Sequence, residues 1–182
     1  DSGHGGVDAG ATGNQIIEKD LNLILTRKLE KELVSRGATV YLTREDDKDL
    51  STTTVNRKRS DLYNRAKYIN KISPNMYISI HLNSVTNSSW RGLQVFYTTK
   101  SEENKLIAET ITNHLRKNMS NVREIKKDNT YYMYKHITSP GVLIEAGFIS
   151  NSNDSYLLRN KEYQDKLISS ISDSIEIYFQ KK

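Results

Sequence analysis

The chain has 182 residues, a formal net charge of +5 and no cysteine. This length fits one domain that can bury a full hydrophobic core. Without cysteine there is no disulfide framework, no thiolate nucleophile and no thiolate metal site, so a metal ion would have to be bound by His, Asp or Glu. No apolar run approaches the roughly 20 residues needed to cross a bilayer, which excludes a transmembrane helix in this chain.

The positive charge is spread over short clusters, among them residues 57–59, 126–127 and 181–182. Scattered clusters of this kind are typical of a solvated surface. No recognised nucleic-acid-binding motif accompanies them, so nucleic acid is not a predicted partner. An acidic polymer such as cell wall is compatible with this charge.

The chain opens on a glycine turn, residues 1–6, that places His4 close to the carboxylate of Asp1. The three glycines of the turn have no Cβ, so they permit a sharp bend and leave space around the imidazole. A neutral imidazole is a common zinc ligand, and Asp1 is near enough in sequence to help orient the ring. Because a strand normally delivers such a turn to a sheet, we expect further residues upstream, including an apolar strand and an export or anchoring segment.

The elements that follow are predicted from periodicity and breakers. Apolar residues spaced by three and four predict an amphipathic helix over residues 18–35, which Gly37 ends. The β-branched and aromatic run 38–43 predicts a strand. The polar stretch 46–54 predicts a surface loop.

A second helix is expected from Asn56 to Ser73, because a residue that precedes a proline, here Pro74, avoids helical geometry. The run 76–82 then predicts a strand with His81 at its C-terminal end. In open α/β sheets, ligands gather just outside such strand ends.

The second half of the chain continues the alternation of strands and helices. We predict a strand over residues 92–98, a helix capped by Ser101, a short strand or extended segment over 131–134, and a helix over 163–179. No repeat or linker interrupts these elements. Residues 1–182 are therefore expected to form one α/β domain.

One acidic residue interrupts the apolar run 142–146. The residues expected on both faces of this strand are apolar, as in a central strand, except for Glu145. A carboxylate inside a buried strand is unfavourable unless it is paired or bound to a cation. Glu145 is therefore a candidate functional residue.

Three further residues complete a candidate site. His4 lies in the glycine turn, Glu18 at the start of the first helix and His81 at a strand end; two imidazoles and a carboxylate are a known ligand set for catalytic zinc, which keeps a position for water. Zinc lowers the pKa of water and polarises a carbonyl. Glu145 is then suited to accept the proton of the attacking water. Together these parts indicate metal-assisted amide hydrolysis.

Each of these residues also has a structural explanation, and His4 and His81 can be ordinary structural histidines. Glu18 can stabilise the N-terminus of its helix through the dipole, and Glu145 can pair with an arginine such as Arg65. Of the other histidines, His114 is expected to be a solvated helix residue and His136 to lie at the surface, where contact with substrate is possible.

Five segments, taken in order, carry a specific resemblance. They are Asp1-Ser2-Gly3-His4-Gly5-Gly6, then Glu18, then Leu42-Thr43-Arg44, then Ser79-Ile80-His81-Leu82-Asn83, then Leu143-Ile144-Glu145-Ala146-Gly147-Phe148-Ile149-Ser150-Asn151. In this order they resemble the motifs of the zinc-dependent N-acetylmuramoyl-L-alanine amidases of the amidase-3 type, and they span most of the chain.

The resemblance implies a twisted, mostly parallel sheet of about six strands with helices on both faces. It implies one Zn²⁺ ion held by His4, Glu18 and His81, with Glu145 as the catalytic carboxylate. The substrate would be peptidoglycan, and the bond cleaved would be the amide between the lactyl group of N-acetylmuramic acid and the L-alanine of the stem peptide.

Asn83 and Arg44 also lie in matching motifs and are predicted to assist substrate binding. Asn83 can instead cap a turn, and Arg44 can pair with nearby acids. A zinc metallopeptidase that acts on stem peptides and a non-catalytic wall-binding protein with the same fold are the alternative functions.

The compact form, with neither wall-binding repeats nor a long insert over the metal, is most similar to the spore-cortex, CwlD-like subgroup. The catalytic domain of an autolysin or of a phage lysin would have a similar sequence. The resemblance implies a secreted enzyme of sporulation or germination. It would act outside the cytoplasm, in the cell wall or in the space between the membranes around a forming spore. Since no module targets the wall, a protein partner or an N-terminal anchor is expected to supply localisation or activation.

Overall fold

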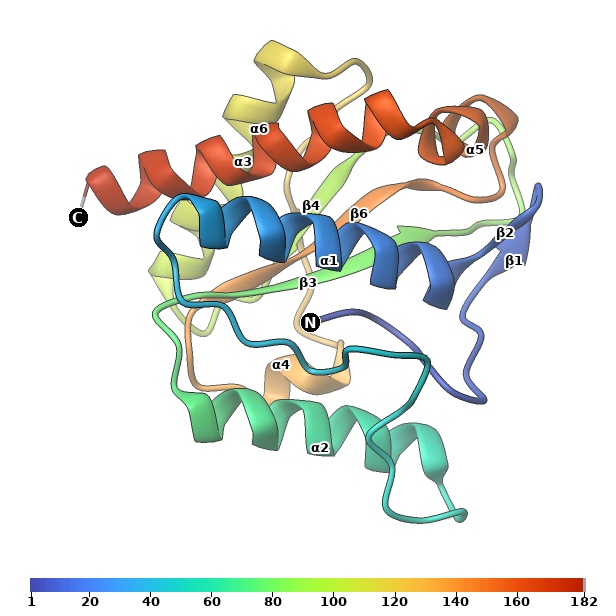
Figure 1. Cartoon of the computed structure of the whole chain (residues 1–182), viewed down its shortest axis with the longest axis vertical. Helices are drawn as coiled ribbons and strands as arrows, with labels where there is room; N and C mark the ends of the chain where they lie inside the picture. The colour runs from blue at the N-terminus through green and yellow to red at the C-terminus, as the bar shows by residue number, and fades with distance from the viewer. Residues whose placement is uncertain (182) are drawn as a thin grey trace.

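The computed structural model describes residues 1–181 and has three layers, a β-sheet between two groups of helices (Figure 1). Three helices cover one face: α1 (Glu18–Ser35), α3 (Glu102–Asn118) and α6 (Lys161–Gln180). Two helices cover the other face: α2 (Arg57–Ile72) and α4 (Tyr132–His136). A further short helix, α5 (Ser152–Arg159), leads into α6. The prediction of a single α/β domain with helices on both faces is confirmed.

The central sheet has four strands in the order β3-β6-β4-β5. These are β3 (Tyr77–Asn83), β6 (Gly141–Phe148), β4 (Gln94–Tyr97) and β5 (Lys126–Lys127). Strand β6 runs parallel to β3 and antiparallel to β4, and β5 runs parallel to β4. A separate antiparallel pair, β1 (Thr12–Gly13) and β2 (Ile16–Ile17), precedes α1. Over the described residues, the main sheet is therefore smaller and more mixed than the predicted six mostly parallel strands.

The helices α1, α2 and α6 begin and end within two residues of their predicted bounds. Their apolar residues recur over several helical turns, so one atypical residue changes the predicted length little. The predicted cap of α3 is also present, because the Ser101 side chain accepts a hydrogen bond from the backbone N–H of Glu103.

The strand predicted over residues 38–43 is wrong, since this segment forms no strand in the described structure. Its residues line an open groove of about 630 Å³ together with parts of α1, α2 and β3. The adjoining edge of β3 pairs with the first residues of the chain, through Gly3 N to Ile80 O (3.1 Å) and Ile80 N to Asp1 O (2.9 Å). β-branched side chains favour a strand only where the backbone can form hydrogen bonds with a neighbouring strand.

The strand or extended segment predicted over residues 131–134 is also wrong, because α4 occupies this place. The helical turn buries the adjacent side chains Met133 and Tyr134 in a small core with Ala66 of α2 and Leu143 of β6. Aromatic residues suit strands and buried helices alike, so the run of tyrosines does not distinguish the two.

Alternate residues of the two parallel strands enter two separate cores. Ile80 and Ile144 belong to the larger core under α1, α3 and α6, whereas Leu143 belongs to the smaller core next to α2 and α4. Successive side chains of a strand point to opposite faces. His81 and Glu145, each one residue beyond its apolar neighbour, therefore share the face covered by α2 and α4.

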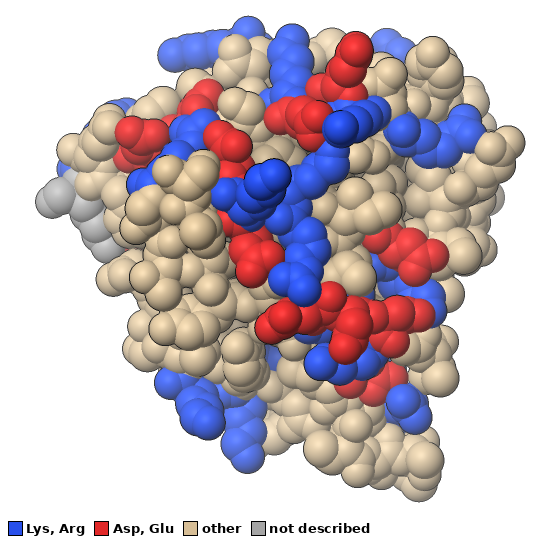
Figure 2. Space-filling model, viewed as in Figure 1, with Lys and Arg blue, Asp and Glu red and all other residues tan. Residues whose placement is uncertain are grey.

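Charged side chains of both signs are interspersed over the face that carries α1 (Figure 2). Arg36, for example, lies 2.8 Å from Glu32 and 2.7 Å from Asp173. This pattern agrees with the predicted solvated surface. Among the described residues, no helix combines the length and the apolar character that crossing a bilayer requires.

Candidate metal centre

The turn that carries His4 is held from several sides. His4 has a φ of +61°, in the left-handed region that residues other than glycine seldom adopt. The turn is closed by hydrogen bonds from Gly5 N to Asp8 O (3.0 Å) and from Asp8 N to Gly5 O (3.1 Å), and Arg65 Nη2 donates to the carbonyl of His4 (2.5 Å). Such unfavourable backbone conformations persist where the surrounding structure enforces them, as at functional sites.

Two glycines make room for the side chains of the site. A Cβ on Gly3 would lie 2.3 Å from the imidazole of His81, and a Cβ on Gly10 would lie 2.6 Å from the carboxylate of Glu18 and 2.8 Å from the ring of His4. The predicted space in the turn is therefore present. It accommodates the neighbours of His4 as well as His4 itself.

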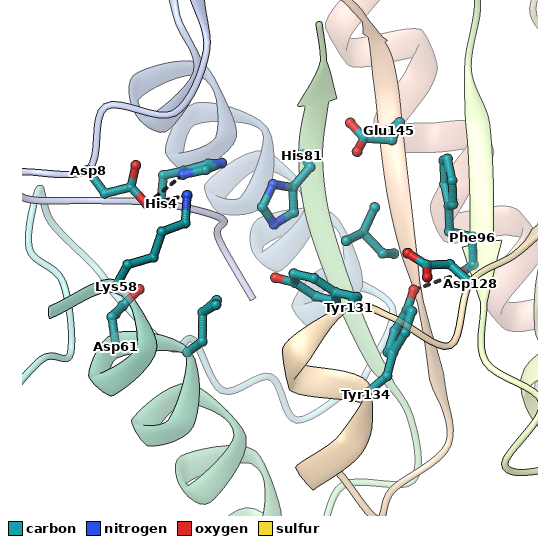
Figure 3. A pocket seen from close by; sticks show the side chains of 12 residues that line it. His4, Asp8, Lys58, Asp61, His81, Phe96, Asp128, Tyr131, Tyr134 and Glu145 are labelled. Atoms are coloured by element: carbon teal, nitrogen blue, oxygen red, sulfur yellow. Dashed lines mark hydrogen bonds and ion pairs between the residues drawn. The ribbon is translucent and has the colours of Figure 1, made fainter. Parts of the chain in front are cut away.

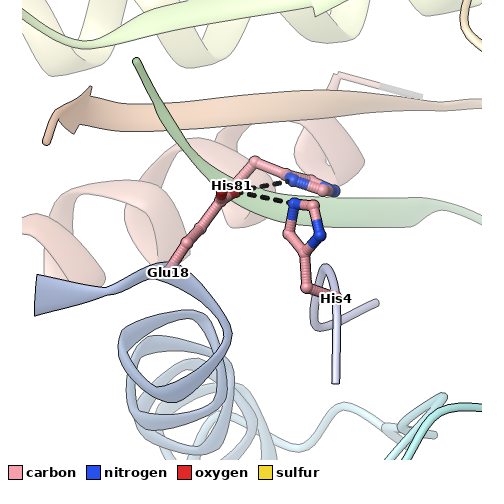
Figure 4. Close-up of side chains that lie close together, drawn as sticks. All are labelled: His4, Glu18 and His81. Atoms are coloured by element: carbon pink, nitrogen blue, oxygen red, sulfur yellow. Dashed lines mark hydrogen bonds and ion pairs between the residues drawn. The ribbon is translucent and has the colours of Figure 1, made fainter. Parts of the chain in front are cut away.

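Three side chains that are far apart in sequence converge next to this turn (Figure 4). His4 comes from the turn, Glu18 from the first residue of α1 and His81 from the end of β3. One possible ligand atom from each lies within 4.8 Å of the others. Glu18 Oε1 is 3.1 Å from His4 Nε2 and 3.0 Å from His81 Nδ1, and the two rings meet edge to face with centroids 5.0 Å apart.

Glu18 is an ionised group in this site although only 4% of it is exposed. Burial opposes ionisation, but hydrogen bonds with His4 and His81 outweigh it and hold the pKa of this carboxyl well below its usual range. The backbone N–H groups of Ala11 (2.8 Å) and Leu82 (3.1 Å) also donate to it. Since donors fix both carboxylate oxygens, the acid is positioned as well as charged.

The two imidazoles differ in their protonation behaviour. Burial lowers the pKa of His81 below its usual value despite the neighbouring Glu18. Burial acts on His4 as well, but Glu18 and Asp8 outweigh it and raise the pKa of His4. His81 Nε2 is buried and has no hydrogen-bond partner among the described residues. The nitrogens that meet Glu18 Oε1 are Nδ1 of His81 and Nε2 of His4, and two imidazole nitrogens that converge on one carboxylate oxygen fit a bound cation of the zinc type.

Asp8, not Asp1, contacts the ring of His4. Asp8 Oδ2 lies 3.0 Å from His4 Nδ1. Asp1 is held behind the turn, where its carboxylate is 2.9 Å from Arg65 and accepts a hydrogen bond from the hydroxyl of Thr43 (2.7 Å). The prediction that Asp1 orients the ring is therefore wrong. The overlooked feature of the sequence is the second acid, four residues after His4.

Glu145 lies beside His81 on the neighbouring strand, since the two are paired in the β3–β6 register (Figure 3). Both line a pocket of about 240 Å³. Glu145 Oε2 is buried without a hydrogen-bond partner in the described structure. Burial, with a smaller effect of the negative charge on Glu18, raises the pKa of Glu145 to about 8. The structural alternative fails, because Arg65 pairs with aspartates instead.

The aromatic wall of the pocket was not anticipated. The ring of Tyr131 packs edge to face against His81 (centroids 6.1 Å apart) and against Tyr134 (5.2 Å). Burial raises the pKa of Tyr131 beyond its usual value, so its hydroxyl stays protonated. These side chains were missed because a strand was predicted here, whereas it is a helical turn that brings them to the pocket.

The two residues predicted to assist substrate binding lie outside the lining of this pocket. Arg44 is only 1% exposed. Its guanidinium donates to four backbone carbonyls, those of Ser2, Gly3, Lys19 and Asp46. These contacts favour a role in holding the turn. Asn83 ends β3, where its carbonyl accepts a hydrogen bond from Ile149 N (2.8 Å).

The other two histidines lie outside the candidate metal group. His114 on α3 is half-buried rather than solvated, with Nε2 3.5 Å from Asp173 of α6. His136 packs its ring against Tyr132 (4.6 Å between centroids) and Tyr63 (5.6 Å) at the surface between α2 and α4.

The chain is similar to known proteins over its full length. Residues 1–177 match the Amidase_3 family, described as N-acetylmuramoyl-L-alanine amidase. The chain is 42% identical over 187 residues to the germination-specific N-acetylmuramoyl-L-alanine amidase of Bacillus subtilis (strain 168), an alignment that covers 100% of this chain and 79% of the relative.

Two solved structures are similar over the full length. One is the CwlD amidase from Clostridioides difficile in complex with the GerS lipoprotein, with a TM-score of 0.94 and 36% identity over 100% of this chain and 96% of that chain. The other is the catalytic domain of CwlV, an N-acetylmuramoyl-L-alanine amidase from Bacillus (Paenibacillus) polymyxa var. colistinus, with a TM-score of 0.86 and 29% identity over the same shares of the two chains.

Proposed function

Because the chain belongs to the amidase-3 family of N-acetylmuramoyl-L-alanine amidases, we propose that His4, Glu18 and His81 hold a catalytic zinc ion and that Glu145 is the catalytic carboxylate. As a member of this family, the chain hydrolyses the amide bond between N-acetylmuramic acid and L-alanine in peptidoglycan. The observation that supports the assignment of the site is the convergence of the three possible ligands, with His4 Nε2 3.1 Å and His81 Nδ1 3.0 Å from Glu18 Oε1.

Each residue has a distinct part in this proposal. Asp8 Oδ2 lies 3.0 Å from His4 Nδ1 and so helps to hold the ring with Nε2 directed toward Glu18. Zinc bound here would polarise a carbonyl and lower the pKa of water. Glu145 takes the proton of the attacking water and passes it to the amide nitrogen as the carbon–nitrogen bond breaks. Its raised pKa suits both transfers near neutral pH.

The names of two relatives support a proposal for the setting of the reaction. The relative from B. subtilis is named for germination, and the C. difficile amidase is in complex with a lipoprotein. This chain is proposed to act on the peptidoglycan of the spore cortex, outside the cytoplasm. A protein partner or an anchor is proposed to localise or activate it.

Digestion of purified peptidoglycan followed by mass spectrometry tests the proposed site and reaction. The zinc-loaded chain should release stem peptides with a free N-terminal alanine, and a chelator should stop the release until zinc is restored. The variant Glu109→Gln, on exposed α3 surface, should behave like the wild type. Shortened stems still attached to glycan would show a peptidase instead, and chelator-resistant release would contradict the metal centre.

A further inference from the structure

A basic groove lies between α2 and α4 at the surface. It is about 840 Å³ in volume, and its cations are Arg57, Lys58 and Arg59 of α2 and Lys135 of α4. Lys58 lines both this groove and the pocket of the candidate metal centre, so the two hollows adjoin. We propose that the basic groove binds carboxylate groups of the stem peptide, an inference that rests on the proposed function.

The groove and the pocket differ in the charged side chains that line them. No carboxylate lines the groove among the described residues. The pocket, in contrast, is lined by four acids: Asp8, Asp61, Asp128 and Glu145. A flexible anionic ligand is therefore attracted to the groove, since a hollow lined by one sign of charge concentrates ions of the other sign.

Two of the four cations are available for a ligand. Arg57 lies 2.8 Å from Asp49 and Lys58 lies 3.4 Å from Asp8, so other acids partly neutralise these two. Arg59 and Lys135 are exposed, and neither has a carboxylate partner in the part of the chain that the structure describes. They project from different helices and border the same groove. Arginine and lysine on two sides of a groove suit a carboxylate between them.

The aromatic residues of the groove keep one of these cations in place. The guanidinium of Arg59 lies over the ring of Tyr132, 5.3 Å from its centroid, and Arg59 Nε donates to the Tyr132 hydroxyl (3.4 Å). The ring of His136 also packs against Tyr132, with the centroids 4.6 Å apart. A cation held over an aromatic ring loses less side-chain freedom when it binds an anion.

The chemistry of the substrate identifies the anion. When the muramoyl–alanine amide lies in the pocket, the sugar side offers neutral hydroxyl and acetamido groups, because the lactyl carboxyl is consumed in the amide. The peptide side carries free carboxylates. The groove therefore receives the peptide side of the substrate and sets its orientation across the candidate metal centre.

Two matched substrates test this inference: a muramoyl peptide with free stem carboxylates, and the same peptide with those carboxylates converted to carboxamides. The wild type should have the lower KM for the carboxylate form. Arg59→Gln and Lys135→Gln should each raise that KM about fivefold, as expected for the loss of roughly one exposed ion pair. Both variants should leave kcat unchanged for both substrates and KM unchanged for the carboxamide substrate. Lys117→Gln, on α3 at the opposite face of the sheet, is the matched control.

Equal KM values of the wild type for the two substrates would overturn the inference. The inference would also be overturned if each variant raised the KM for the carboxylate and the carboxamide substrate by the same factor. If the wild type released no peptide from either substrate, the failure would lie in the proposed function and not in the groove. The thermal stability of each variant should match the wild type, since both altered side chains are exposed.

Discussion

Two glutamates at one site have opposite environments. Glu18 is buried among hydrogen-bond donors and imidazoles, which keep it ionised. Glu145 is buried with an unpartnered oxygen, and burial raises its pKa to about 8. Environments that separate two carboxyl pKa values commonly separate their roles. Glu18 thus suits a metal ligand and Glu145 a group that exchanges protons.

Replacing Glu145 by glutamine tests its role in the reaction. The variant Glu145→Gln keeps the shape of the side chain but removes its ability to accept a proton. We expect kcat to fall at least about 100-fold, the lower end of a general-base contribution, with the zinc content unchanged. Steady-state kinetics and metal analysis of the same preparations measure both. Wild-type turnover in this variant would remove Glu145 from the mechanism.

The pKa of Glu145 also predicts how stability depends on pH in chelator-treated protein. Between its ordinary value of 4.5 and about 8, this group is protonated in the folded chain and ionised in the unfolded chain. Unfolding then releases a proton, so a rising pH lowers the free energy of unfolding by about 1.4 kcal/mol per unit from this group. The contribution is complete below pH 4.5 and is lost as the pH approaches 8.

Urea denaturation of the wild type and of Glu145→Gln across this pH window measures the effect. The free energy of unfolding should fall more steeply with pH in the wild type, because glutamine does not titrate. Parallel pH profiles would show that the carboxyl has an ordinary pKa in the folded chain.

At the scale of elements, the long helices were predictable and the short elements were not. A helix such as α1 repeats its apolar face over five turns, and that repeat is a local property of the sequence. A strand depends on a partner from elsewhere in the chain. Residues 38–43 have strand-forming side chains without a ladder, whereas β5 is a strand of two lysines because β4 lies beside it.

The candidate site followed from the sequence only in part. The acid in β6 was conspicuous because an apolar strand surrounded it. His4, Glu18 and His81 are too far apart in sequence for a local zinc motif, and only the ordered resemblance linked them. Asp8 could not be assigned in advance, since the closing of the turn decides which acid meets the ring.

Arg65 of α2 connects that helix to the turn of the metal centre. It is 1% exposed and lies 2.9 Å from both Asp1 and Asp61, and it donates to the carbonyl of His4. The variant Arg65→Met leaves two buried carboxylates without their cation, so we expect it to destabilise the chain by about 3–5 kcal/mol.

Arg59→Met is the matched control, because Arg59 lies on the same helix, is exposed and has no carboxylate partner among the described residues. The control variant should lower the free energy of unfolding by less than about 1 kcal/mol. Urea denaturation of the two variants gives the comparison. Equal losses would mean that Arg65 does not anchor the turn.

At the scale of the whole molecule, the fold gathers four distant positions at one edge of the sheet. The turn after the N-terminus, the start of α1 and the C-terminal halves of β3 and β6 supply them (Figure 1). The helices α2 and α4 on that face add the aromatic wall of the pocket and the basic groove beside it. The architecture thus joins the proposed metal centre to a surface that distinguishes the two sides of its substrate.

Locating the metal tests the central claim most directly. X-ray diffraction from zinc-loaded crystals, recorded on both sides of the zinc absorption edge, would identify the ion and its ligands. We predict one anomalous peak between His4, Glu18 and His81, about 2.0–2.1 Å from a nitrogen of each imidazole and about 2.0–2.2 Å from a carboxylate oxygen. A peak at any other place, or none at these three side chains, would contradict the account.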